Sequence, residues 1–213
     1  MTAHHVPATA GSPVVAPIGQ AARAGRAPGR IATLAVLLVT GALVLGAAYL
    51  TNRGSGDAGL TAVNLTGTPN GPAPIIGQPA PNISATQADG SAIKLSDLKG
   101  SIVWLSFGAS WCQPCRAENA DVQATYEAFK AKGVVVVQVF MDEDAAAVTD
   151  YAGRVGLTYT KVPDPLGRLS TDYRILGIPT HFFIDRDGIL RDIKVGTLQA
   201  DAMAQMLRDL GAG

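Results

Sequence analysis

The stretch FGASWCQPCRAEN, residues 107–119, contains both cysteines of this 213-residue chain. Cys112 and Cys115 are separated by two residues, and Trp111 precedes the pair. Two cysteines are too few for a secreted disulfide scaffold, which spreads several along the chain, and too few for a four-cysteine zinc site. A single Cys-X-X-Cys pair therefore indicates thiol chemistry, and we expect neither a metal nor another cofactor.

The pair lies where a strand is expected to lead into a helix. The apolar, β-branched run IVWLSF at 102–107 predicts a buried strand, and a helix should run from about Cys112 to Gly133. The free N–H groups and the dipole of the first helical turn favour a thiolate at Cys112, which is the nucleophilic form. Cys115 follows one turn later, close enough to form a disulfide with Cys112. We therefore expect Cys112 to attack and Cys115 to resolve the mixed disulfide.

Glu118 is a candidate proton carrier because of its place on the predicted helix. One helical face carries Cys115, Glu118, Val122, Tyr126 and Phe129. A partly desolvated carboxyl group one turn beyond Cys115 is suited to exchanging protons with that sulfur. The alternative is an ordinary glutamate that the helix dipole favours in the first turn.

Trp111 and Pro179 are candidates for contacting a protein substrate. Trp111 is expected to form a partly exposed apolar lip, or simply to pack against the domain. Pro179, in GIPT at 177–180, opens a strand, where a proline indicates an edge, a bulge or a cis peptide bond. A cis proline facing the cysteines would expose the backbone around Ile178 for pairing with an extended substrate chain.

The remaining patterns predict an α/β fold. The order of elements indicates a central mixed sheet covered by helices on both faces. The expected strands are 134–140, 180–184 and 189–195, and the expected helices are 145–155, 168–175 and 199–210.

The N-terminal part of the chain predicts a membrane anchor. Residues 1–30 contain three arginines and no acidic residue, and they are expected to form a disordered cytoplasmic tail. Residues 31–50 contain no charge and are long enough to cross a bilayer as a transmembrane helix. The positive-inside rule then places everything after Leu50 outside the cytoplasm. A cleaved signal peptide is the alternative.

Two further expectations concern the middle of the chain and its overall charge. Residues 51–75, rich in Thr, Asn, Gly and Pro, predict a flexible linker before the domain at 76–213. The chain has 17 basic and 17 acidic residues, so its charge gives no reason to expect a nucleic-acid partner.

Several motifs together resemble the thioredoxin superfamily: WCQPC at 111–115, the later IPT at 178–180 and the order of strands. Four further features resemble its membrane-tethered bacterial branch, typified by TlpA, ResA and the cytochrome c maturation thioredoxins. These features are GQPAP at 77–81, LSDLKG at 95–100, Glu118, and the extra length between the second core strand and Pro179. The resemblance covers residues 76–212.

The resemblance implies a thioredoxin-like fold and assigns roles to four residues. Cys112 would be the nucleophile, Cys115 the resolving thiol, Glu118 the acidic tuner and Pro179 the cis proline. It also implies a protein on the outer side of a bacterial cell membrane that reduces protein disulfides, apocytochrome c among them, with electrons from a membrane thiol donor. The chain departs from the pattern at Ser106, where thioredoxins place a buried aspartate, and at Ala120, where many relatives have a proline.

Two other functions are compatible with parts of the sequence. A thiol oxidase would use the same cysteine pair in the opposite direction. A copper chaperone with this fold uses Cys-X-X-X-Cys and a distant histidine, for which His181 is the candidate outside the tail. His181 lies beside Phe182 and Phe183 in an apolar strand, which favours a packed histidine.

Overall fold

The computed structural model describes residues 29–54 and 59–213. The chain divides into two compact units, Met1–Gly54 and Ser55–Gly213. The first contains helix α1, Arg30–Gly54, and the predicted cytoplasmic tail lies outside the described residues except for its last two. Within the described ranges, no helix is both long enough and apolar enough to cross a membrane. The anchor at 31–50 stays a prediction from the sequence.

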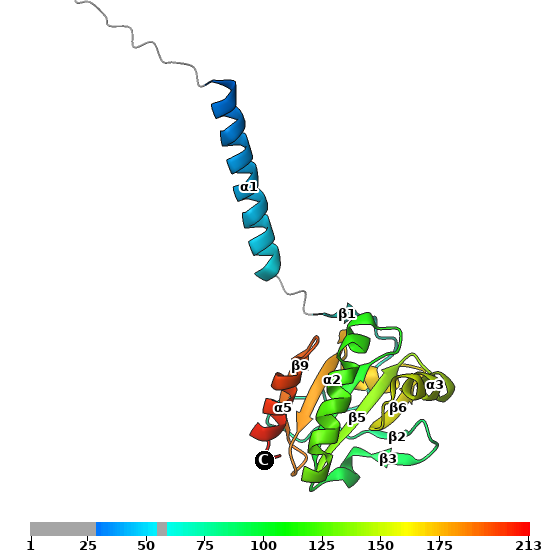
Figure 1. The fold of residues 1–213 in the computed structure, drawn as a ribbon. Helices are drawn as coiled ribbons and strands as arrows, with labels where there is room; N and C mark the ends of the chain where they lie inside the picture. The colour runs from blue at the N-terminus through cyan, green and yellow to red at the C-terminus, as the bar shows by residue number, and fades with distance from the viewer. Residues whose placement is uncertain (1–28, 55–58) are drawn as a thin grey trace, which may run out of the picture. The chain divides into compact units, whose positions relative to one another are not determined.

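The second unit is built on a mixed five-stranded sheet with the order β6-β5-β4-β8-β9 (Figure 1). Strands β4, β5 and β6 are parallel, whereas β8 is antiparallel to both β4 and β9. This confirms the predicted α/β class with a central mixed sheet. The strands are β4 (Ile102–Gly108), β5 (Val134–Met141), β6 (Thr160–Asp164), β8 (Thr180–Ile184) and β9 (Leu190–Val195).

One face of the sheet is covered by three helices, and Figure 1 shows α2 and α5 side by side over it. Each helix contributes apolar side chains to the same buried cluster, in which Trp104 of β4 and Phe183 of β8 are fully enclosed. The helices are α2 (Gln113–Phe129), continued by a 3-10 turn at Lys130–Lys132, α3 (Ala145–Val155) and α5 (Ala200–Asp209). As expected, α2 and its 3-10 extension end at Gly133, and α3 ends at Gly156, both with positive φ.

The opposite face is covered mainly by short and extended segments, which differs from the expected helices on both faces. Alternate residues of β4 and β5 point to this side, because successive side chains of a strand face opposite ways. They pack against the hairpin of β2 (Ser84–Thr86) and β3 (Ala92–Lys94), a 3-10 helix at Leu95–Leu98, and the five-residue helix α4 (Arg168–Asp172).

Most of the predicted linker at 51–75 lies on the domain. From Gly59 onward the segment is described, and Val63 and Leu65 pack against the buried cluster on the α4 side. Asn70 N–H donates to the Asp172 carboxylate at 2.6 Å, and the Arg174 guanidinium donates to Gly71 O at 3.0 Å. These hydrogen bonds hold the segment against the domain, although its composition alone indicates flexibility.

Candidate active site

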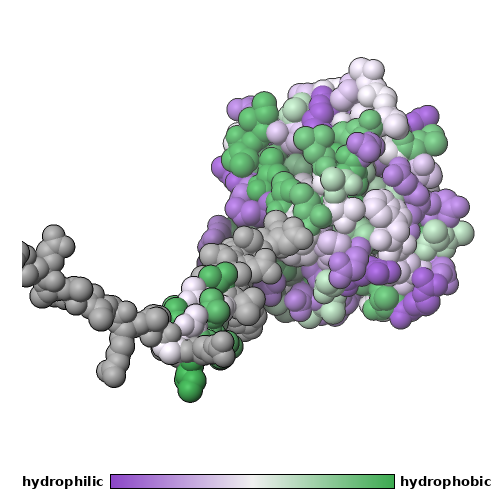
Figure 2. Space-filling model, turned by 90° about the horizontal axis from the view of Figure 1, so that it is seen from above, coloured by the Kyte–Doolittle hydropathy of each residue, from purple (hydrophilic) through white to green (hydrophobic). Residues whose placement is uncertain are grey.

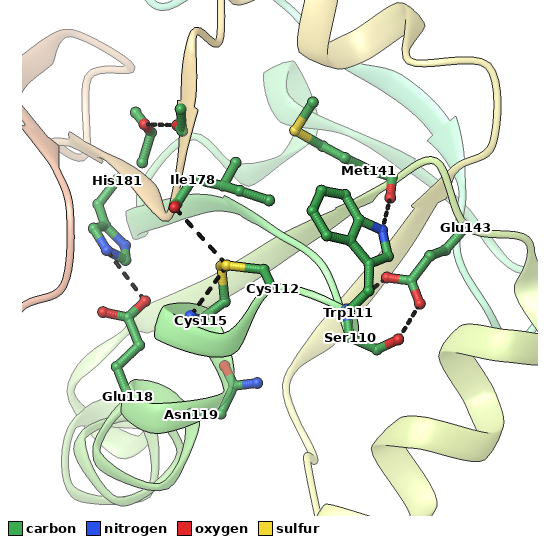
Figure 3. The surroundings of a disulfide bond; sticks show 12 residues. Ser110, Trp111, Cys112, Cys115, Glu118, Asn119, Met141, Glu143, Ile178 and His181 are labelled. Carbon is green, nitrogen blue, oxygen red and sulfur yellow. Dashed lines mark hydrogen bonds and ion pairs between the residues drawn. A yellow bond between two sulfur atoms is a disulfide. The ribbon is translucent and has the colours of Figure 1, made fainter. Parts of the chain in front are cut away.

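The two cysteines begin helix α2 and form a disulfide bond in the structure (Figure 3). Cys112 is the N-cap residue in an extended backbone conformation, and its sulfur accepts a hydrogen bond from Cys115 N–H at 3.2 Å. Pro114 lies in the first turn, where the missing N–H has no helical acceptor to lose. A thiolate at Cys112 would occupy the same N-cap position, facing free N–H groups and the positive end of the helix dipole.

Both sulfur-bearing side chains are buried in the disulfide form. Cys112 and Cys115 are each 1% exposed and belong to the apolar cluster on the α4 side of the sheet. Cys112 can attack a substrate disulfide only if the two sulfurs come into contact. Exchange at Cys112 therefore requires the groups that cover it to move away.

The loop before β8 lies directly against Cys112. The peptide bond between Ile178 and Pro179 is cis, and the carbonyl oxygen of Ile178 lies 3.8 Å from Cys112 Sγ. Ile178 is fully buried as a whole residue. The structure thus places the backbone around Ile178, which the sequence proposed for substrate pairing, beside Cys112.

That backbone already has a partner within the chain. Strand β1 (Thr61–Ala62) pairs antiparallel with β7 (Gly177–Ile178), with Thr61 opposite Ile178 and Ala62 opposite Gly177. Val63 N–H extends the pairing by donating to Leu176 O at 3.1 Å. The expected free backbone edge beside Pro179 is thus occupied by residues that the sequence assigned to a linker.

Glu118 lies on the buried face of α2, as its place among apolar residues indicated. It is 5% exposed, and each carboxylate oxygen faces a donor. Oε2 accepts from Leu198 N–H at 3.1 Å, and Oε1 lies 3.3 Å from His181 Nε2 without the alignment of a full hydrogen bond. Figure 3 shows the two side chains pointing toward each other to the left of the cysteines.

His181 is fully buried, and only one of its two ring nitrogens makes a hydrogen bond. Nδ1 accepts from the indole N–H of Trp104 at 3.2 Å, and Nε2 faces Glu118. Because the indole nitrogen of Trp104 only donates, Nδ1 must be unprotonated and Nε2 carries the proton of the neutral ring. Trp104 thus occupies Nδ1, whereas Nε2 faces Glu118 and forms no full hydrogen bond.

His181 also explains the missing buried aspartate. It pairs with Ser106 in the register between β4 and β8, so the two side chains share one face of the sheet. The buried titratable group below the cysteines is therefore supplied by β8 instead of β4. The sequence gives His181 and Ser106 no visible connection, because they lie 75 positions apart and meet only through strand pairing.

A second polar group approaches Cys115 from β5. A Cβ atom added at Gly108 would lie 3.0 Å from Gln138 Nε2 and 3.5 Å from Cys115 Sγ, so the glycine lets these groups come close. Gln138 Oε1 accepts from Tyr159 OH at 2.5 Å. Burial, with Tyr151 and Glu118 nearby, raises the pKa of Tyr159 well above its ordinary value, so this phenol stays protonated and donates.

Trp111 forms a half-exposed surface beside the cysteines. It is 45% exposed and its indole N–H donates to Met141 O at 3.3 Å. The preceding Ser110 is held by the buried Glu143, whose carboxylate accepts from Ser110 N–H at 2.7 Å and from the Ser110 hydroxyl (Figure 3). The position agrees with both expectations for Trp111, packing and an apolar lip. Sequence reasoning missed Glu143, since nothing marks it as a partner of a residue 33 positions earlier.

Comparison with known proteins places the chain in a family. The sequence model of the AhpC/TSA family matches residues 76–193, more than half of the chain. The thiol-disulfide oxidoreductase ResA of Bacillus thuringiensis subsp. konkukian is 35% identical over 120 residues, which are 56% of this chain and 69% of the relative. ResA of Oceanobacillus iheyensis is 34% identical over 139 residues, which are 63% of this chain and 72% of that protein.

A solved structure agrees with these relatives. The crystal structure of a thiol:disulfide interchange protein of the thioredoxin family from Chlorobium tepidum matches with a TM-score of 0.58 and 29% identity. The match covers 65% of this chain and all of that one. This chain therefore belongs to the AhpC/TSA family and is a thioredoxin-like thiol-disulfide oxidoreductase of the ResA type.

Proposed function

We propose that this oxidoreductase works outside the cytoplasm, held at the membrane by residues 31–50, and that it reduces disulfides in proteins. The observation that carries the proposal is the Cys112–Cys115 disulfide at the start of α2, with the backbone of Ile178 and the cis proline against the attacking sulfur. This arrangement places the nucleophile beside a backbone with which a polypeptide would pair in place of β1.

The proposed reaction transfers two electrons to the substrate in two exchanges. The Cys112 thiolate attacks one sulfur of a substrate disulfide, forming a mixed disulfide and releasing the other substrate sulfur as a thiolate. Cys115 then gives up its proton and attacks Cys112, which forms the internal disulfide and releases the second substrate thiolate. The substrate sulfurs take up protons, and the protein is left oxidised.

Continuous reduction outside the cytoplasm needs a supply of electrons, because that compartment keeps thiols oxidised. We propose a dithiol of a membrane protein as the donor, which would exchange with the Cys112–Cys115 disulfide in the reverse sense. The apolar run at 31–50 supports this arrangement, since an anchored domain stays near a donor in the same membrane. The proposed targets are protein disulfides, and the haem-binding cysteine pair of apocytochrome c is the specific candidate.

The reduction potential of the Cys112–Cys115 pair tests the direction of transfer. We expect a value near that of thioredoxin, about −270 mV, and far from the roughly −120 mV of a strong thiol oxidant. The measurement is equilibration of the full chain in detergent with glutathione buffers, followed by quantification of alkylated thiols. A value near −120 mV would contradict the reducing direction and favour the oxidase, while the exchange chemistry itself would stand.

The substrate and the location are tested together with Cys115→Ser, which cannot resolve a mixed disulfide. We expect this variant to retain a covalently bound protein partner in membranes that have been washed at alkaline pH, with the domain open to protease from outside the cytoplasm. The matched control, Cys112→Ser with Cys115→Ser, should retain none. Release of the chain by the alkaline wash would contradict the anchor without touching the exchange reaction.

A further inference from the structure

The buried pair of Glu118 and His181 joins α2 to β8 and, through Leu198, to the segment before α5. Both side chains are almost completely enclosed, and a buried carboxylate is costly unless donors face its oxygens. Here Leu198 N–H donates to one oxygen, His181 Nε2 lies 3.3 Å from the other, and Trp104 donates in turn to His181 Nδ1. A chain of three side chains thus fixes a carboxylate one helical turn beyond Cys115.

We propose that His181 is a positioning residue that holds Glu118 ready to take the proton of the resolving thiol, Cys115. The proposal rests on the exchange chemistry described above and deepens it. When Cys115 attacks the mixed disulfide, its S–H bond breaks and the proton passes to Glu118, while the electron pair on sulfur forms the bond to Cys112 Sγ. His181 touches neither sulfur and acts only through Glu118.

The groups around the pair support this assignment. From α2, Cys115 and Glu118 are neighbours at i and i+3, which brings their side chains onto one face. Just before β6, the protonated phenol of Tyr159 lies near Glu118. From β9, Lys194 is opposite His181 in the register, but its ammonium pairs with Asp192 at 2.9 Å. His181 is therefore the basic side chain that faces the Glu118 carboxylate, at 3.3 Å.

The test measures the two exchange steps separately with the aromatic disulfide DTNB. Attack by Cys112 releases the first coloured thiolate, and attack by Cys115 releases the second. His181→Phe is expected to slow the second release about tenfold at neutral pH and to leave the first within about twofold. The pH at which the second release becomes fast should move up by about one unit, since Cys115 must then lose its proton to solvent.

Matched variants separate positioning from a general structural effect. His181→Gln keeps an N–H donor near the place of Nε2, and its second release should stay within about threefold of the unchanged protein. In a Glu118→Gln background, His181→Phe should cost nothing further, because its effect runs through the carboxylate. A full tenfold loss in that background would overturn the proposal, as would an unchanged second release in His181→Phe alone.

The experiment distinguishes failure of this proposal from misfolding of the variant and from failure of the proposed function. If His181→Phe loses the near-UV circular dichroism of the fold, Trp104→Phe replaces it, since it removes the donor that fixes the tautomer of His181. The same selective slowing and shift in pH are then expected, and their absence would overturn the proposal. If the unchanged protein releases no coloured thiolate at all, the proposed function fails, which is a different result.

A second inference rests on an independent observation, the pairing of β1 with β7. We define the strap as residues Leu60–Leu65. Its side chains alternate between more and less exposed, as in a strand lying on a surface, and the Leu60 side chain covers Gly177. Figure 2 looks down on the end of the domain that carries β1 in Figure 1, and apolar side chains gather on that face.

We infer that the strap is a built-in occupant of the substrate groove and that a substrate displaces it. An extended substrate chain pairing at Ile178 would need the backbone groups that Thr61 faces, so the two cannot pair there at once. Val63 and Leu65 of the strap pack against the apolar cluster that contains Cys112, which is 1% exposed. The strap therefore restrains exchange until an extended polypeptide competes for β7.

The first release from DTNB, which reports attack by Cys112, tests the strap. Val63→Pro removes the N–H that donates to Leu176 O, and Val63→Ala keeps it while removing the same packing. The proline variant should release the first thiolate about fivefold faster than the alanine variant. Leu60→Ser, at a half-exposed position, should raise the rate about twofold and guards against misfolding of the proline variant. Equal rates in all three variants and the unchanged protein would overturn the inference.

Discussion

Replacing Cys112 by serine is expected to lower the rate of protein disulfide reduction by about a thousandfold or more. A serine hydroxyl is not ionised near neutral pH, and the N-cap position that favours a thiolate at residue 112 does not make an alkoxide available. Cys115 lies inside the first turn of α2, whereas Cys112 is the N-cap residue beside Ile178, so Cys115 is not placed to attack a polypeptide in its stead. The measurement is reduction of insulin by the full chain with dithiothreitol as the electron source.

The matched control for this change is Gln113→Ser, which alters the exposed residue between the cysteines and leaves both sulfurs in place. Its rate should stay within a few-fold of the unchanged protein. Retention of most of the activity in Cys112→Ser would mean that Cys115 is the attacking sulfur, and the assignment of the two roles would have to be exchanged.

The central strands could be predicted because their sequences report their environment. The run at 102–107 is apolar on both faces, and the structure buries every residue of β4 between the helices and the short segments. The strand at 180–184 was placed with the same bounds that β8 has. β6 escaped prediction because Thr160–Asp164 is short and contains Pro163, which is tolerated at the sheet edge where β6 lies.

The strap carries a weak strand pattern, which the composition of residues 51–75 makes hard to recognise. Thr, Asn and Gly dominate residues 51–75 and indicate flexibility, yet Val63 and Leu65 stand two positions apart and both pack against the domain. This spacing of two is the pattern of a half-buried strand. It is too short to be persuasive alone, and its partner β7 lies more than a hundred residues later.

Some residues of the candidate site could likewise be predicted from the sequence, and others could not. Cys112, Cys115 and Glu118 could be found because they lie within seven residues on one predicted helix, where spacing fixes their relative positions. His181 could not be connected with them, because its distance from Glu118 depends on the register of β8 against β4 and on the packing of α2 over the sheet. Local periodicity predicts which face a residue occupies, and tertiary packing decides what it meets there.

Trp104 supports the pair of Glu118 and His181. Replacing this tryptophan should have the largest effect on the stability of the domain. Trp104 is fully buried, and its ring is stacked on Phe183 with centroids 5.4 Å apart. Trp104→Ala is expected to lower the free energy of unfolding by about 3–5 kcal/mol, since it leaves a cavity that the rigid sheet cannot close. The measurement is urea denaturation of the oxidised full chain in detergent, followed by circular dichroism.

Trp104→Phe separates packing from the hydrogen bond to His181. Phenylalanine keeps an aromatic ring against Phe183 but leaves His181 Nδ1 buried without a donor, which should cost about 1–3 kcal/mol beyond the smaller packing loss. If the phenylalanine variant were as unstable as the alanine variant, the hydrogen bond would outweigh the packing. The indole would then be present chiefly to fix the tautomer of His181, and through it the carboxylate of Glu118 beside the resolving cysteine.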